Sequence, residues 1–352
     1  MGKPLDGVRV LDLSRLLPGP YATLVLSDLG ADVVKVEDPE PGDYLREISP
    51  GMFAALNRGK RSVVLDLKSA PGAAQFRSLC ARADVLVESF RPGVLERLGF
   101  KDLVADPGRL VICRISGFGQ GPTAGAWRDR AGHDIGYVGL AGVIARNRGV
   151  PAVQLGDLFG GAQGAVIGVL AALVERGRTG RGRVVDVAMT QGSTGLLLPH
   201  LGELPYAPEN MLDGSRPCYR VYPCKGGGAY ALGALEPKFW ERFCQAVEHQ
   251  EWKGRGLDLA LAPEVDALFA ERSRDEWDSL LRVADCCGEP VLTPAELFEH
   301  PLFAEAFVGG LPRTYPALVA TGELPQAAAP SRGQHTEEVL REWTAAPASP
   351  PG

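Results

Sequence analysis

Three short motifs in the sequence place a side chain that can exchange a proton beside a glycine or a proline. They are Gly132-His133-Asp134, Gly156-Asp157-Leu158 and Glu236-Pro237. Imidazole and carboxylate groups serve as general acids and bases because their pKa values can be tuned toward neutral pH. One interpretation of the three motifs is therefore proton transfer to and from a carbon atom.

Each motif also has an ordinary structural explanation. Asp157 could be the N-cap of a helix, and His133 could be a histidine whose ring only completes local hydrogen bonds. Glu236 could simply precede a helix that begins at Pro237, a residue favoured at the first helical position. Only the three motifs together, in this order, point to a catalytic site.

The composition is that of a globular protein with mild acidity. Of 352 residues, 45% are hydrophobic and 23% charged, and the net charge is −6 with a pI near 5.5. Basic residues are mixed with acidic ones, which argues against a nucleic-acid partner.

The cysteines show neither CxxC pairs nor spacing for zinc, so we expect reduced thiols, no metal and a cytoplasmic location. They are Cys80, Cys113, Cys218, Cys224, Cys244, Cys286 and Cys287.

The first half of the sequence alternates between apolar runs typical of strands and patterns typical of helices. We expect strands at 8–13, 31–36, 62–67, 84–88 and 109–115, and helices at 21–29 and 72–83 after turns. Such alternation predicts an α/β fold with a mostly parallel sheet. Because ligands bind beyond the carboxyl ends of parallel strands, the loops after Leu13, Val36, Glu88 and Ser116 are the candidate binding loops.

A long helix is expected from Asp157 to Glu175. Gly160, Gly164 and Gly168 are spaced by four residues, so they lie on one face and permit close packing. The apolar stretch 165–174 is too short to cross a bilayer, and the N-terminus has no apolar run of signal-peptide length. We therefore expect a core helix and no membrane partner.

After about residue 195 the pattern predicts a smaller α+β domain. Strands are expected at 218–223 and 229–234, followed by helices at 237–248, 263–272 and 274–284. A last short helix is expected at 336–343. The predicted domains are a large α/β domain, 1–195 with a returning segment 313–352, and a small domain, 196–312.

One glycine-rich segment superficially suggests a dinucleotide site. Gly117-Phe118-Gly119-Gln120-Gly121 has GxGxG spacing instead of GxGxxG, and Pro122 follows where a helix would have to continue. We therefore do not expect a nicotinamide or flavin dinucleotide.

Longer motifs give the sequence a specific resemblance. The stretches LDGVRVLDLSRLLPGPYATLVLSDLGADVVKVE, ADVLVESFRPGVLERLG, GDLFGGAQGAVIGVLAAL and NMLDGSRPCYRVYPCKGG resemble those of the family III coenzyme A transferases, the CaiB/BaiF superfamily. The similarity runs from about Leu5 to about Gln334. Within the superfamily, His133-Asp134, GDLFGG and GALEP resemble the α-methylacyl-CoA racemase branch, whereas the transferases typically carry Tyr-Asp at the first position.

This resemblance implies a Rossmann-like large domain, a smaller domain and an interlocked homodimer. It also implies racemisation of 2-methylacyl-CoA thioesters in lipid metabolism, through an enolate. His133 and Asp157 would act on opposite faces of the α-carbon, and Glu236 from the partner chain would support His133. Backbone N–H groups at the start of the Asp157 helix would stabilise the enolate oxygen.

The resemblance leaves two other functions open. The first is a family III CoA-transferase that moves coenzyme A between carboxylic acids through an aspartyl intermediate at Asp157. The second is an acyl-CoA-binding protein that has lost the chemistry, against which the intact His133, Asp157 and Glu236 argue.

The resemblance also suggests which residues bind coenzyme A. Arg91, Arg97, Asn57 and Arg58 match family positions associated with the coenzyme, and no cofactor or metal beyond the CoA moiety is implied. The sequence departs from the family at two positions. Relatives usually have an arginine where Asp38 stands, so a phosphate contact is expected to be missing, and asparagine where Gly136 stands.

Overall fold

A computed structural model describes residues 3–206, 211–304, 306–312, 314 and 328–344. The chain divides into two compact units, Met1–Leu198 with Ala306–Gly352 (the large unit) and Pro199–Glu305 (the small unit). The boundaries between these units fall after Leu198 and after Glu305, whereas the predicted domain boundaries fall after residues 195 and 312.

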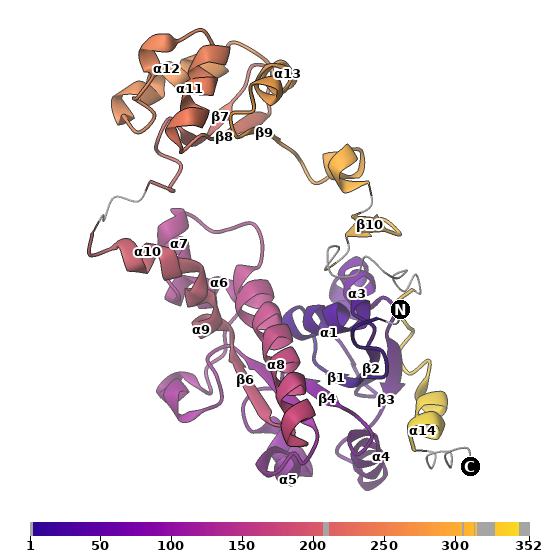
Figure 1. The fold of residues 1–352 in the computed structure, drawn as a ribbon. Helices are drawn as coiled ribbons and strands as arrows, with labels where there is room; N and C mark the ends of the chain where they lie inside the picture. Colours follow the sequence, from indigo (N-terminus) through magenta and orange to yellow (C-terminus); the bar gives the residue numbers. More distant parts are fainter. Residues whose placement is uncertain (1–2, 207–210, 305, 313, 315–327, 345–352) are drawn as a thin grey trace. The chain divides into compact units, whose positions relative to one another are not determined.

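The large unit is built on a parallel sheet of six strands (Figure 1). The strands are β1 (Arg9–Leu13), β2 (Asp32–Glu37), β3 (Arg61–Val64), β4 (Val85–Glu88), β5 (Val111–Ser116) and β6 (Val184–Ala188). Their order in the sheet is β3-β2-β1-β4-β5-β6. Strands β2 and β3 are added on one side of β1, and strands β4, β5 and β6 are then added on its other side. The strand order therefore reverses between β1 and β4. The predicted α/β fold is confirmed.

Both faces of the sheet are covered, which explains why its strands are almost continuously apolar. Val10, Val33, Val85 and Val111 face one core, shared with helices α1 (Pro18–Asp28) and α8 (Gly164–Thr179). The alternate residues Leu11, Val34, Leu86 and Ile112 face a second core, shared with α4 (Ala70–Cys80) and the returning helix α14 (Thr336–Thr344). Successive residues of each strand therefore belong to opposite cores.

Shorter elements complete the large unit. They are α2 (Leu45–Ile48), α3 (Pro50–Asn57), α5 (Lys101–Ala105), α6 (Asp134–Leu140), α7 (Val143–Asn147), α9 (Met189–Thr194), α10 (Leu198–Glu203), β10 (Phe307–Val308) and β11 (Leu311–Pro312), with helical turns at η1 (Glu96–Phe100), η2 (Pro122–Trp127) and η4 (Gly195–Leu197). Helix α10 begins in the large unit and continues into the small one. All seven cysteines are free thiols, and six of them are buried.

Two sequence-based expectations differ from the structure in this unit. Helix α1 begins at Pro18 and not after the Pro18-Gly19-Pro20 segment, because proline is well accommodated in the first helical turn. Strand β6 was not predicted, although its Val184, Val185 and Val187 pattern is typical of a strand.

The glycine-faced helix is longer than its apolar stretch alone suggests. A π-helical segment, η3 (Gly156–Gln163), runs directly into α8. A Cβ on Gly168 would lie 2.5 Å from Val185 Cγ1, and one on Gly160 would lie 2.3 Å from the carbonyl oxygen of Met189. Among the described residues this is the one helix, Gly156–Thr179, that is long and apolar enough to span a bilayer. Its glycine face packs against β6 and α9, but Ile167 and Val174 on the same helix are exposed, so the helix is buried on one side and not throughout as expected for a core helix.

The small unit holds an antiparallel sheet and three main helices. The strands β7 (Tyr219–Pro223), β8 (Ala229–Gly233) and β9 (Gly288–Val291) pair in that order, and β9 was not predicted. The helices are α11 (Pro237–Ala246), α12 (Ala262–Phe269) and α13 (Arg274–Ala284), with helical turns at η5 (Gln250–Trp252), η6 (Leu259–Leu261), η7 (Glu296–Phe298) and η8 (Pro301–Phe303). The core is aromatic: the ring of Tyr222 stacks on Phe269 at 4.2 Å. The expected smaller α+β domain is confirmed.

Candidate active site

A cavity of about 570 Å³ opens at the carboxyl ends of β1, β4 and β5. This is the point where the strand order reverses, and in open α/β sheets such points hold ligands. The cavity is lined by Arg15, Leu16, Pro18, Tyr44, Ser89, Phe90, Arg91, Pro92, Ile115, Ser116, Gly117, Arg128, Arg130, Ala131, Gly132, His133, Tyr137, Asp157 and Met189. All four loops selected from the sequence, those after Leu13, Val36, Glu88 and Ser116, contribute to this wall, and the loop after Val36 does so through Tyr44.

His133 is the residue immediately before helix α6. Its backbone is extended, with φ −137° and ψ 170°, and its carbonyl accepts hydrogen bonds from Gly136 and Tyr137. The imidazole makes no capping hydrogen bond and is exposed to the cavity. The ring is therefore not used for local structure, contrary to the ordinary explanation of this motif.

Asp157 lies in the first turn of η3, and the N-cap of that helix is Leu155. The N-cap explanation of Asp157 is therefore wrong. The backbone N–H of Asp157 donates a 2.8 Å hydrogen bond to Oδ1 of Asp134, at the start of α6. Gly156 makes this approach possible, because a Cβ there would lie 3.0 Å from Asp134 Oδ1 and 3.3 Å from Val138 Cγ1. The two helix starts are thus joined, and His133 and Asp157 line the same cavity.

The environment of Asp157 changes its acidity. Burial and, as the second cause, the negative charge of Asp134 together raise the pKa of Asp157 to about 7. A carboxyl group with a pKa near 7 is divided between acid and base at neutral pH. This is the property that a group exchanging protons with a substrate requires.

The expected enolate donors at this helix start are not available. The N–H of Asp157 is bonded to Asp134, and the N–H of Leu158 donates to the carbonyl of Gln154 at 2.9 Å. The prediction that these backbone amides stabilise an enolate oxygen is therefore wrong for the first two residues after Gly156. The side chain of Asp134 takes the place that a substrate oxygen would need.

Glu236 belongs to the small unit, at the end of the segment that follows β8. It immediately precedes α11, whose first residue is Pro237, so the helix-start explanation describes its backbone correctly. Its carboxylate makes no capping hydrogen bond and is exposed. The side chain is therefore not needed by the helix it precedes.

The four residues expected to bind coenzyme A fall into two groups. Arg91 is exposed and lines the cavity, and Arg97, on η1, is exposed but lies outside the cavity wall. Arg58 is buried and holds Asp28 through two hydrogen bonds of 2.7 Å. Asn57 is fully buried, donates to the carbonyl of Phe53 and accepts from Lys60. The structure therefore brings Arg91 alone of these four into the cavity with His133 and Asp157.

Three other arginines in the wall, Arg15, Arg128 and Arg130, were not predicted. Arg15 follows β1 and so stands in one of the candidate loops. Arg128 and Arg130 come from the loop before α6, where no strand end gave a signal. Together with Arg91 they make one side of the wall strongly cationic, which suits an anionic ligand.

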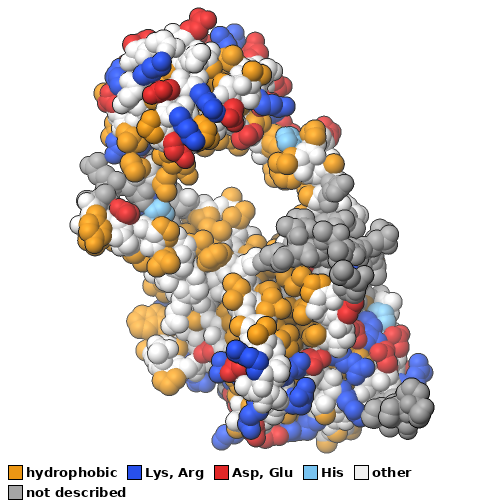
Figure 2. All heavy atoms as spheres, in the orientation of Figure 1, with side chains coloured by type: hydrophobic (Ala, Val, Ile, Leu, Met, Phe, Trp, Pro, Cys, Tyr) orange, Lys and Arg blue, Asp and Glu red, His pale blue; other side chains and the backbone are white. Residues whose placement is uncertain are grey.

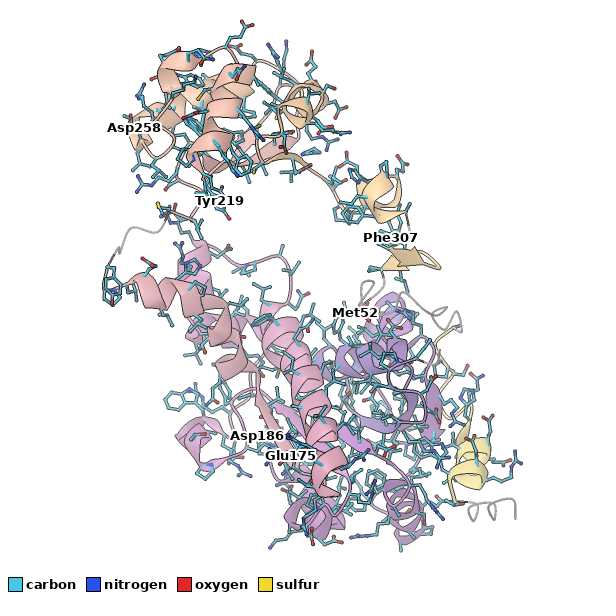
Figure 3. The ribbon with its side chains drawn as sticks, viewed as in Figure 1. Met52, Glu175, Asp186, Tyr219, Asp258 and Phe307 are labelled. Atoms are coloured by element: carbon cyan, nitrogen blue, oxygen red, sulfur yellow. The ribbon has the colours of Figure 1, made fainter. Side chains whose placement is uncertain are left out.

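Tyr137 was also missed, although it follows His133 by one helical turn. Its ring is held between two glycines, because a Cβ would lie 2.5 Å from the ring at Gly117 and 2.6 Å at Gly132. The loop containing Gly117 is fixed in turn by Asp186 of β6, the residue labelled in Figure 3. Its carboxylate accepts hydrogen bonds from the backbone of Gln120 and Gly121. Gly117 of this segment therefore serves close packing at the cavity.

Comparison with known proteins shows the family of this chain. The sequence profile of CoA-transferase family III matches residues 5–348. The human alpha-methylacyl-CoA racemase is 37% identical over 96% of this chain and 93% of its own length. The succinyl-CoA–D-citramalate CoA-transferase of Chloroflexus aurantiacus is 32% identical over 97% and 94%. A crystal structure of a CaiB/BaiF family protein from Brucella suis, 27% identical, superimposes with a TM-score of 0.82 over 97% of this chain and 100% of that one. The chain is therefore a member of the enzymes of CoA-transferase family III.

Proposed function

We propose that this enzyme racemises 2-methylacyl-CoA thioesters by removing the α-proton from one face and delivering a proton from a second group to the opposite face. The observation that carries the proposal is that an imidazole and a carboxyl group, those of His133 and Asp157, line the same cavity. The similarity to an alpha-methylacyl-CoA racemase at 37% identity supports the same reaction.

The reaction needs one deprotonated and one protonated group on the two faces of the α-carbon. With the pKa of Asp157 raised to about 7, this carboxyl can serve either as base or as acid, depending on which epimer is bound. His133 serves on the other face. Removal of the α-proton gives an enolate, and protonation from the opposite side gives the other epimer, so the overall reaction requires no second substrate.

The cationic side of the cavity suits the phosphates of coenzyme A. Guanidinium groups bind phosphate through charge-assisted hydrogen bonds, and Arg91, Arg128 and Arg130 line the wall. In this proposal the thioester lies between this cationic side and the His133–Asp157 side. The chemistry calls on no cofactor or metal beyond the CoA moiety of the substrate, and we place the enzyme in the cytoplasm and in lipid metabolism.

We further propose that the enzyme acts as a homodimer in which Glu236 of a second copy supports His133. Two observations favour a second copy. The Glu236 carboxylate is exposed and unused by its own helix. Several large apolar side chains are also exposed on one chain, among them Ile167 and Val174 of α8 and Leu198 and Leu201 of α10. Figure 2 shows hydrophobic side chains gathered on this face of the large unit, while charged side chains gather toward the end where α4 and α5 lie.

The alternative is a CoA-transferase in which Asp157 attacks the thioester and carries an acyl anhydride and then coenzyme A as a thioester. The 32% identity to a CoA-transferase favours this alternative.

The decisive experiment is NMR of a 2-methylacyl-CoA in deuterated water with the enzyme and no carboxylic acid acceptor. Racemisation predicts exchange of the α-proton for deuterium and loss of optical purity. Absence of exchange, together with transfer of coenzyme A to an added acid, would show that the alternative is correct.

A further inference from the structure

Arg15 stands on the cavity wall in the loop between β1 and α1, and the backbone on both sides of it is fixed by polar groups. Lys35 Nζ donates to the carbonyl of Ser14 at 3.0 Å, and the N–H of Leu16 donates to Asp43 Oδ1 at 3.2 Å. Lys35 and Asp43 are both buried, and they form an ion pair of 2.8 Å. A buried charged pair thus holds the loop that presents Arg15.

The same loop is joined to the loop that carries Arg91. The N–H of Arg15 donates to Ser89 Oγ at 3.2 Å, and Ser89 lies two residues before Arg91. Strands β1 and β4 are neighbours in the sheet, so these two loops leave the sheet side by side. Arg15 and Arg91 are therefore two cations on the same side of the cavity.

The guanidinium of Arg15 is oriented by two side chains. Its Nη2 forms an ion pair with Asp38, and its Nη1 lies 3.4 Å from the hydroxyl of Tyr44. Its Cζ also lies 5.4 Å from the centre of the Tyr44 ring. The side chain is only 23% exposed. A guanidinium has five N–H donors, so donors remain for a ligand after these two contacts.

We propose that Arg15 binds a phosphate group of the CoA substrate and that Asp38 is its positioning residue. The proposal rests on the function proposed above, since it takes an acyl-CoA as the ligand. A guanidinium already held by Asp38 and Tyr44 loses little freedom when it binds, which favours affinity. Asp38 stands where the family resemblance led us to expect a missing phosphate contact. Arg15 supplies a cation there from the neighbouring strand.

The test compares two ligands that differ in their phosphates. Binding of coenzyme A is measured by calorimetry, and kcat/KM for α-proton exchange is measured with a 2-methylacyl pantetheine thioester, which has no phosphate. Arg15→Ala should weaken coenzyme A binding about tenfold or more and leave the pantetheine thioester reaction within about twofold. The matched control is Arg82→Ala, because Arg82 is exposed and lies outside the cavity wall. It should change neither measurement.

Two results would overturn the role of Arg15. One is unchanged coenzyme A affinity in Arg15→Ala, and the other is an equal loss with both ligands, which would indicate a structural role. Because coenzyme A binding is measured without turnover, a wild type that binds coenzyme A normally but exchanges no α-proton would refute racemisation while leaving Arg15 in place. A wild type that does not bind coenzyme A would refute both proposals.

The positioning role of Asp38 has its own measurement. Asp38→Ala should weaken coenzyme A binding several-fold, whereas Asp38→Asn, which keeps an acceptor for Arg15, should bind at least as tightly as wild type. In an Arg15→Ala background, Asp38→Ala should have no further effect, because Asp38 acts through Arg15. A full additional loss in that background would show that Asp38 does not act through Arg15.

Discussion

The backbone N–H of Asp157 donates a 2.8 Å hydrogen bond to the side chain of Asp134, 23 residues earlier in the chain. This bond places a second carboxylate beside the one whose pKa is raised to about 7. Because Asp134 follows His133 directly, the same bond also fixes the start of the helix that carries the histidine. This contact therefore fixes the start of the helix that follows His133, and it places beside Asp157 a charge that adds to the larger effect of burial on the pKa of Asp157.

The raised pKa of Asp157 has a consequence for stability. A carboxyl whose folded-state pKa lies above the unfolded value of 3.8 contributes stability that is fully present below pH 3.8 and is lost as the pH rises through about 7. Asp157→Asn cannot titrate. We therefore expect the free energy of unfolding of this variant, relative to wild type, to increase between pH 4 and pH 8 by roughly 2–4 kcal/mol. Urea unfolding of both proteins across this range tests it, and parallel pH profiles would contradict it.

The charge of Asp134 can be removed without removing its hydrogen bond. In Asp134→Asn the amide oxygen can still accept from the N–H of Asp157, but the negative charge that raises the pKa of Asp157 is gone. We expect the rise in kcat/KM for the epimer deprotonated by Asp157 to move to lower pH by about one unit. The measurement is the pH profile of α-proton exchange. An unshifted profile would mean that Asp134 does not tune Asp157.

The glycine face of the long helix should be sensitive to a single methyl group. Gly160→Ala would place a Cβ 2.3 Å from the carbonyl oxygen of Met189 and 2.6 Å from Ser193 Oγ, so the helix must move away from α9. We expect a loss of about 2–3 kcal/mol in the free energy of unfolding.

Gly177→Ala in the same helix is the matched control, because nothing lies within 4 Å of its added Cβ. It should stabilise the protein by about 0.5–1 kcal/mol. Equal effects of the two substitutions in urea unfolding would refute the packing argument.

The proposed homodimer predicts that the two copies remain together on dilution, since interlocked chains can separate only by unfolding. Native mass spectrometry over a dilution series should show a dimer at every concentration at which the protein is folded. A folded monomer that catalyses α-proton exchange would rule out both the dimer and the contribution of Glu236 from a second copy.

The sequence predicted the sheet well because its signal is local. Apolar runs such as those around Val10 and Val33 are long enough to identify buried parallel strands, and the candidate loops follow from where those strands end. The strand β9 was missed because Gly288-Glu289-Pro290-Val291 contains a glycine and a proline, which are unusual in strands. That strand is defined by its pairing with β8, a contact that no local pattern contains.

The candidate site could be predicted only in part for the same reason. His133 and Asp157 stand in recognisable motifs, whereas the bond from Asp157 to Asp134 depends on how two distant helices meet. Arg15 resembles any surface arginine in the sequence, and only its ion pair with Asp38 and its place in the cavity wall distinguish it. Arg58 shows the converse: its family position suggested a ligand contact, whereas the structure shows it paired with Asp28 in the interior, a contact that its motif does not reveal.

The identity of the two acid–base groups can be tested by asking which epimer each variant still deprotonates. If His133 and Asp157 act on opposite faces, His133→Ala should impair exchange from one epimer and Asp157→Asn exchange from the other, each by about 10²–10⁴-fold for a lost acid–base group. Glu236→Gln should resemble a milder form of the histidine variant, because it removes a supporting carboxylate and leaves the base in place.

A transferase predicts a different result for each of these measurements. Asp157→Asn would abolish all activity, His133→Ala would be tolerated, and hydroxylamine would trap an acylated or thioesterified Asp157 in the wild type. The measurements are NMR exchange rates for both epimers and mass spectrometry of the hydroxylamine-treated enzyme. Exchange from both epimers without a trapped adduct supports racemisation, and a trapped adduct without exchange contradicts it.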